Sequence, residues 1–128
     1  MKLTFKKYER LKSKKLIAQL YEHGFAFNEY PLRIIFLPIK HESKVPILTG
    51  ITVSKRFFKN AVDRNRLKRL MREAYRHQKP NLYQQTSDEY ICMISYIGKR
   101  KITYQEIFFV MEKLLKKFVE HQNTKHEN

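Results

Sequence analysis

The chain of 128 residues is poor in the residues from which catalytic and metal sites are built. It contains one cysteine, Cys92, so no disulfide can form within the chain and no metal site with several thiolate ligands is possible. Its three glycines stand far apart, which excludes a glycine-rich loop that cradles phosphate. Two of its five histidines, His121 and His126, fall in a polar C-terminal segment. We therefore predict no catalytic residue and no metal ligand in the protein itself.

Acidic residues are also scarce, and the basic residues that outnumber them are concentrated. The chain has 27 Lys and Arg against 12 Asp and Glu, which gives a net charge of +15. Residues 1–15 carry +6 and residues 55–76 carry +7, so the other 91 residues carry only +2. Charge gathered in two segments favours a surface that binds a polyanion, and nucleic acid is the commonest such partner. Acidic membranes and acidic proteins are the alternatives.

Long hydrophobic runs are missing as well. No stretch is long enough to span a membrane, and no apolar segment follows the basic N-terminus as it does in a signal peptide. We therefore expect a cytoplasmic protein without a membrane partner. The apolar content of 42% is nevertheless that of a folded domain with its own core.

Apolar periodicity predicts one α+β domain over residues 1–120, a sandwich of one sheet with helices. The predicted elements are a helix that begins after Ser13 and ends at Gly24, strands at 25–28, 32–39 and 48–54, a helix that begins after Asn60, a loop at 80–88, a strand at 90–97 and a helix that begins after Thr103. Ser13, Asn60 and Thr103 are residue types that cap helix N-termini. Residues 121–128 are polar, and we predict a disordered tail there.

The helix predicted after Asn60 has two unlike faces. With about 100° per residue, one face is apolar and holds Leu67, Leu70, Met71 and Ala74. The opposite face, here called the basic stripe, holds Asn65, Arg69, Arg72 and Arg76, with Lys68 beside them and Arg64 and Arg66 on its flanks. A solvated charged face usually intersperses acids for i,i+4 pairing, and this one does not. Because an arginine can grip phosphate oxygens with two donors, the stripe predicts a nucleic-acid contact, to RNA or to DNA.

The run AVDRNRLKRLMRE at residues 61–73 resembles the Arg-Asn-Arg motif of the bacterial ribonuclease P protein subunit. The preceding run GITVSKR at residues 50–56 is similar to the strand that leads into the motif helix of that family. Other matches follow in the family's order, so the resemblance covers almost the whole chain. They are Arg10-Leu11, His23-Gly24, a strand at 89–96 and a helix after Tyr104.

The resemblance implies the element order αβββαβα, with one mainly antiparallel sheet and a left-handed connection around the motif helix. It also implies a protein cofactor of the ribonuclease P ribozyme, an endonuclease whose catalysis resides in the RNA subunit. The protein would bind that catalytic RNA and the single-stranded 5′ leader of precursor transfer RNA, whose removal gives the mature 5′ end. Magnesium ions would be bound mainly by the RNA subunit and the substrate, and none stably by the protein.

The resemblance further implies which residues contact RNA. Those that would face or border the catalytic RNA are Lys55, Arg56, Lys59, Arg64, Asn65, Arg66, Lys68, Arg69, Arg72 and Arg76. A cleft for the leader would use Ile17 and Tyr21 on the first helix, with Ile35 and Phe36 on the sheet. Tyr21 is the best candidate for stacking on a base, and plain core packing is the alternative for Ile17 and Tyr21.

Three positions depart from the family pattern, none of them in the central motif. Ile17 stands where the family usually has an aromatic residue, the turn at 57–59 is longer than usual, and Ser95 stands where an arginine is common. Two other functions remain open. One is a structural RNA-binding protein, such as a ribosomal one, and the other is a DNA-binding protein that uses the same helix in a major groove. We expect RNA as the partner and no DNA.

Overall fold

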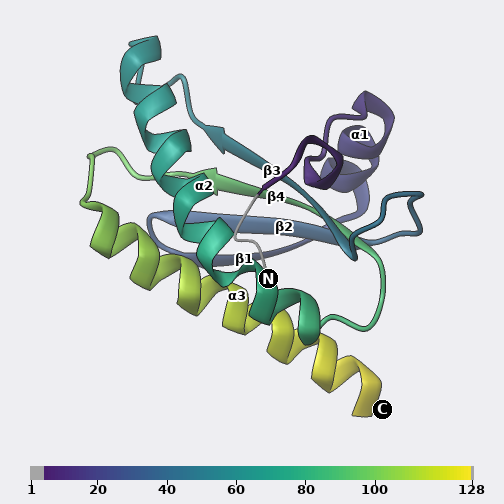
Figure 1. Ribbon diagram of the computed structural model, residues 1–128. Coiled ribbons are helices and arrows are strands. Elements are labelled where there is room, and N and C mark those ends of the chain that lie inside the picture. The colour runs from purple at the N-terminus through teal and green to yellow at the C-terminus, as the bar shows by residue number, and fades with distance from the viewer. Residues whose placement is uncertain (1–4, 128) are drawn as a thin grey trace.

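The computed structural model describes residues 5–127, with side chains for residues 5–124 (Figure 1). Its elements are η1 (Lys7–Glu9), α1 (Lys14–His23), β1 (Phe25–Glu29), β2 (Leu32–Pro38), β3 (Ile47–Val53), α2 (Ala61–Gln84), β4 (Tyr90–Tyr96) and α3 (Tyr104–Glu127). Apart from the short 3-10 turn η1, this is the predicted order αβββαβα. The predicted α+β class is confirmed.

The four strands form one mixed sheet in the order β1-β2-β4-β3. The pairs β1–β2 and β2–β4 are antiparallel, whereas β3 and β4 are parallel neighbours joined through α2. The N-terminal segment lies along the outer edge of β3, where the Leu11 amide donates to the Thr49 carbonyl oxygen at 3.0 Å. The handedness of the β3–α2–β4 connection stays a prediction.

The two faces of the sheet are covered unequally. Helices α2 and α3 cross one face, and α1 lies on the other, near the end where β2 passes into the β2–β3 loop (Figure 1). The face under α2 and α3 holds the main core, which includes Phe36, Tyr96, Met71 and Phe118, all without solvent exposure. The α1 face holds a smaller cluster of buried residues, comprising Leu11, Leu20, Leu48, Ile91 and Met93. Part of that face is therefore left open beside α1.

All three predicted N-caps are confirmed by hydrogen bonds. Ser13 Oγ accepts from the Leu16 amide at 3.2 Å, and Asn60 Oδ1 accepts from the Val62 amide at 2.9 Å. Thr103 Oγ1 accepts from the Glu106 amide at 3.2 Å. Each cap satisfies one of the amides that a helix N-terminus leaves without a partner. The local sequence therefore determines where these helices begin.

Two predicted helix ends are wrong. Helix α2 continues through Pro80 to Gln84, where the sequence predicts a loop from residue 80. Burial of Lys79 and Leu82 holds this last part of the helix in place, and it outweighs the preference of proline for a helix end. Helix α3 continues to Glu127, where the sequence predicts a disordered tail from His121. The His121 ring packs 5.2 Å from that of Phe36, and Gln122 is buried, so this turn is anchored on the core.

Candidate nucleic-acid interface

The turn before α2 is held by the first arginine of the motif. Arg64 Nη1 donates to the carbonyl oxygens of Phe58 and Lys59, both at 2.8 Å, and Arg64 is half-buried. These bonds fix the turn that carries Lys55, Arg56 and Lys59, all three exposed. Arg64 therefore shapes the surface as well as adding charge to it.

Most of the basic stripe is not neutralised by described acids of the protein. Asn65, Arg66 and Arg69 are exposed, and Lys68 and Arg72 are half-buried. Among the residues that the structure describes, none of the four basic side chains forms an ion pair with a carboxylate. Arg66, Lys68, Arg69 and Arg72 thus keep their full charge toward solvent or a ligand.

The two acids of α2 are engaged elsewhere. Asp63 Oδ1 pairs with Lys101 Nζ at 2.7 Å. Glu73 pairs with Arg76 and His77, and hydrogen bonds from Arg76 lower the pKa of the Glu73 carboxyl. Arg76, predicted to contact RNA, therefore has part of its charge balanced within the protein, and it lies on the side of α2 toward Tyr104.

A second basic turn lies beside the start of α2 and is missing from the predicted contact residues. The Phe57 ring lies between two cations, with Arg56 Cζ and Lys99 Nζ each 5.5 Å from its centroid. Lys101 is tied to α2 by its ion pair with Asp63. The parallel pairing of β3 and β4 explains this, because the segments that follow two parallel neighbours leave the sheet at the same edge. Residues 99–101 thus extend the basic surface.

The open part of the sheet beside α1 is the face on which the leader cleft is predicted. Gly24 allows α1 to approach β2 closely, since a Cβ atom there would lie 2.8 Å from Ile35 Cγ2 and 2.4 Å from the Leu20 carbonyl oxygen. Ile17 and Ile35 are half-buried in the small cluster under α1. Tyr21 is 55% exposed, so the core alternative for this residue is wrong. Its ring is open to solvent on α1, one helical turn after Ile17.

Beyond Ile35, the floor of the cleft becomes polar. Register places Arg33 opposite Ser95, and Ser95 opposite Thr52, on the face that carries Ile35 and α1. Arg33 is exposed. It brings a positive charge to the strand position directly beside Ser95, and it was absent from the predicted set. Alternation along β2 could have found it, because residues 33 and 35 share one face of a strand.

The placement of Phe36 in the cleft is wrong. Phe36 has no solvent exposure and lies on the opposite face of the sheet, with its ring 4.9 Å from that of Phe118. Consecutive residues of a strand point to opposite faces, so Ile35 and Phe36 could not both line the cleft. Phe36 is a core residue.

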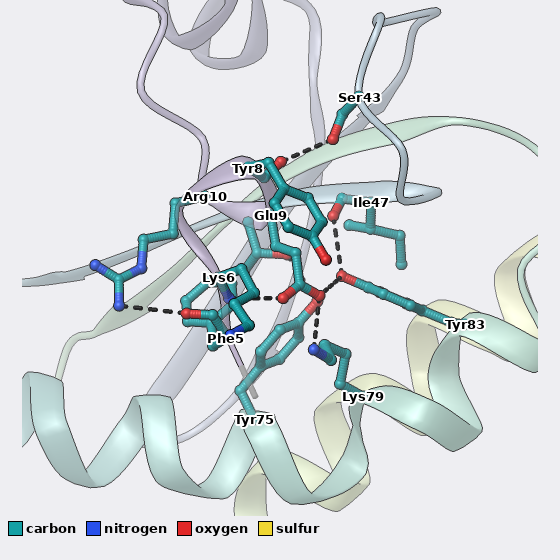
Figure 2. Close-up of polar contacts among 11 residues, drawn as sticks. Phe5, Lys6, Tyr8, Glu9, Arg10, Ser43, Ile47, Tyr75, Lys79 and Tyr83 are labelled. Carbon is teal, nitrogen blue, oxygen red and sulfur yellow. Dashed lines mark hydrogen bonds and ion pairs between the residues drawn. The ribbon is translucent and has the colours of Figure 1, made fainter. Parts of the chain in front are cut away.

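A buried polar centre, which no sequence pattern predicted, joins the N-terminal segment to the second half of α2 (Figure 2). Glu9 Oε1 accepts from Lys79 Nζ at 2.6 Å and from the Tyr83 hydroxyl at 3.1 Å, while Glu9 Oε2 accepts from the Lys6 amide at 2.6 Å. The Glu9 and Lys79 side chains are 3% and 7% exposed. Burial raises the pKa of the Tyr83 hydroxyl, which therefore remains a donor. Because both oxygens of the Glu9 carboxylate accept hydrogen bonds, this centre fixes η1 against α2.

The described residues lack two other features, a membrane-spanning helix and a cluster of metal ligands. No helix there is both long and apolar enough to cross a membrane. Within the same residues, no three His, Cys, Asp or Glu side chains gather closely enough to hold a metal ion.

Unpaired cations along one helix face, a second basic turn beside it and an adjoining cleft with an exposed aromatic ring are typical of proteins that bind nucleic acid. A model of the ribonuclease P family matches residues 5–119, and the chain belongs to this family.

Individual relatives agree with this assignment. The ribonuclease P protein component of Chlamydia trachomatis serovar L2 is 38% identical over 81 residues, which are 63% of this chain and 65% of that protein. The one from Porphyromonas gingivalis is 42% identical over 74 residues, 57% of this chain and 53% of that protein. The matched region is thus less than two thirds of either relative. The solved RNase P protein of Staphylococcus aureus shares the fold, with a TM-score of 0.68 at 23% identity over 87% of this chain and 94% of that one.

Proposed function

We propose that this protein is the cofactor of the ribonuclease P ribozyme, and that it binds the catalytic RNA through the first half of α2. The observation that carries the proposal is the basic stripe within the family's central motif, whose Arg66, Lys68, Arg69 and Arg72 have no carboxylate partner among the described residues. Phosphate groups of a folded RNA would neutralise these charges and release counterions. Lys55, Arg56 and Lys59 would extend the contact along the turn before α2.

The cleft beside α1 would hold the single-stranded 5′ leader of precursor transfer RNA. Tyr21 offers an exposed ring on which a base can stack, and Arg33 offers a cation for the leader backbone. Ile17 and Ile35 would form the apolar wall between them. The protein would in this way hold the leader while the RNA subunit removes it.

Catalysis belongs to the RNA in this proposal. Magnesium ions would be held mainly by the RNA subunit and the substrate, and no three His, Cys, Asp or Glu side chains gather among the described residues. The part played by the protein is binding and the placing of positive charge among crowded phosphates, which lowers the magnesium needed for folding and cleavage. Such a protein would work in the cytoplasm, where it would meet precursor transfer RNA.

The proposal is tested by reconstitution. Protein freed of RNA by nuclease treatment should not cleave precursor transfer RNA, whereas the same protein with the catalytic RNA should restore cleavage at the mature 5′ end at low magnesium. Arg66→Ala with Arg69→Ala should reduce that rescue. Lys113→Ala with Lys116→Ala, which removes the same charge from exposed positions on α3, should not.

Three results would contradict the proposal. Specific cleavage by RNA-free protein would place catalysis in the protein. Equal effects of the two double variants would show that net charge alone matters. Native co-purification of ribosomal RNA or DNA, in place of one abundant structured RNA, would favour a structural RNA-binding protein or a DNA-binding protein.

A further inference from the structure

The N-terminal segment carries an arginine whose surroundings lack a counter-charge. The Glu9 carboxylate points into the buried centre with Lys79 and Tyr83, while the Arg10 side chain extends in the opposite direction (Figure 2). Among the described residues, Arg10 Nη2 donates to the Phe5 carbonyl oxygen alone, at a long 3.4 Å. Arg10 Nε is buried and has no hydrogen-bond partner within the same residues. A buried donor without an acceptor costs stability, so this arrangement calls for a ligand.

Arg10 is held beside α2 by aromatic packing. Its guanidinium lies 5.2 Å from the centroid of the Phe5 ring, and that ring meets the Tyr75 ring edge-on at 5.4 Å. Arg72 precedes Tyr75 by three residues, so both project from the same side of the helix. These ring contacts hold Arg10 beside the part of α2 that carries Arg72, and they do not depend on any ligand.

The two guanidinium groups oppose each other electrostatically. Partial burial, and next the charge of Arg10, lower the pKa of Arg72 below its ordinary value. No described carboxylate pairs with either group, because Glu9 is bound to Lys79 and Glu73 is bound to Arg76 and His77. Two like charges on neighbouring elements, neither with a described carboxylate partner, favour an anion between them.

We propose that Arg10 and Arg72 form a two-arginine clamp for one phosphodiester of the catalytic RNA, at the junction between the N-terminal segment and the basic stripe. Two planar forks from different elements can surround the oxygens of a single phosphate, and a phosphate would supply the acceptor that Arg10 Nε lacks. The clamp would fix the RNA in register along α2. This inference rests on the proposed function, and it names a contact residue outside the motif helix.

Affinity measurements with the catalytic RNA alone, without precursor, test the clamp. Arg10→Gln and Arg72→Gln should each raise the dissociation constant about tenfold or more, since each removes charged hydrogen bonds. The double variant should be little worse than either single variant, because both groups bind the same phosphate. Lys116→Gln, an exposed control on α3, should change affinity little. The melting temperature of free Arg72→Gln should equal or exceed that of the wild type, because a repulsion is removed.

The outcomes separate the clamp from the proposed function. The clamp is overturned if the double variant loses RNA affinity by the product of the two single losses. It is also overturned if the single variants keep their affinity, or if Arg72→Gln has a lowered melting temperature. An effect seen only with precursor carrying a leader would move the phosphate from the catalytic RNA to the substrate and overturn the proposal as stated. As a second probe, inorganic phosphate should raise the melting temperature of the wild type more than that of the double variant. If that shift is found while the wild type fails to bind the catalytic RNA, the proposed function falls and the anion site stands.

Discussion

The two halves of α2 carry similar residues and use them differently. In the first half, Arg66, Lys68 and Arg69 have no carboxylate partner among the described residues, and their charge is available to a ligand. In the second half, Lys79 is buried against Glu9, and its ion pair with that carboxylate holds η1 against the helix. A lysine or arginine in a basic helix is thus a binding group or a structural group according to what faces it, and a count of charges cannot tell the two apart.

The largest effect expected from this contrast is on stability. Lys79→Ala removes one partner of a buried ion pair and leaves the Glu9 carboxylate without its cation, which should lower the free energy of unfolding by about 3–5 kcal/mol. Urea denaturation measures the change. Lys68→Ala, in the first half of α2, is the matched control and should cost less than about 1 kcal/mol. Equal costs for the two lysines would erase the distinction between the halves.

The cleft gives the next largest effect, and it is one on binding. Tyr21→Ala should weaken the affinity of the assembled complex for precursor with a leader by about 1–3 kcal/mol, because one stack on a base is lost. Mature transfer RNA has no leader and should bind as before. Tyr30→Ala, which removes a still more exposed tyrosine from the β1–β2 turn, is the control. Loss of affinity for both RNAs alongside a lower melting temperature would show that Tyr21 acts through stability and not through stacking on the leader.

The cap of α2 should have a smaller effect. Asn60→Ala removes the acceptor for the Val62 amide and should cost about 1 kcal/mol in the free energy of unfolding. Asn60→Asp keeps an acceptor oxygen and should retain most of that stability. Thermal or urea unfolding of the two variants provides the comparison. If Asn60→Ala is as stable as the wild type, water satisfies the amide and the cap contributes nothing.

The smallest expected effect is on the reactivity of the Cys92 thiol, which lies beneath the second half of α2. Cys92 Sγ lies 3.4 Å from Thr49 Oγ1, which is 2.8 Å from the Tyr75 hydroxyl, and burial raises the pKa of the thiol to about 12. Alkylation at pH 8 should therefore proceed only through unfolding, and Lys79→Ala should accelerate it. Since the unfolded thiol loses its proton at about pH 8.5, this group should lower stability as pH rises above that value. Rapid labelling of the native wild type would show that the region is open.

Sequence patterns predicted the features that depend on neighbouring residues. The three N-caps and the apolar face with Leu67, Met71 and Ala74 are as expected, since capping and periodicity are local. Local rules failed at Pro80, because burial of Leu82, two residues later, outweighs the preference of proline for a helix end. They could not reveal the Glu9–Lys79 pair, whose members lie 70 residues apart.

The candidate site was predicted in part for the same reason. The basic stripe follows from helical spacing, but its lack of acidic partners depends on where Asp63 and Glu73 are bound. Arg33 and Lys99 were missed because their places require the strand register and the pairing of β3 with β4. The error at Phe36 could have been avoided from the sequence, since alternation along β2 places Phe36 and Ile35 on opposite faces of the sheet.

The salt dependence of binding to the catalytic RNA tests the central contrast most directly. For Arg66→Ala with Arg69→Ala, the slope of the logarithm of the binding constant against the logarithm of salt concentration should become shallower by about one to two, with an unchanged free energy of unfolding. For Glu9→Gln with Lys79→Gln, measured where the variant is folded, the slope should stay as in the wild type while the free energy of unfolding falls. An unchanged slope in the first variant, or an equal change of slope in both, would contradict the division of α2 into a binding half and a structural half.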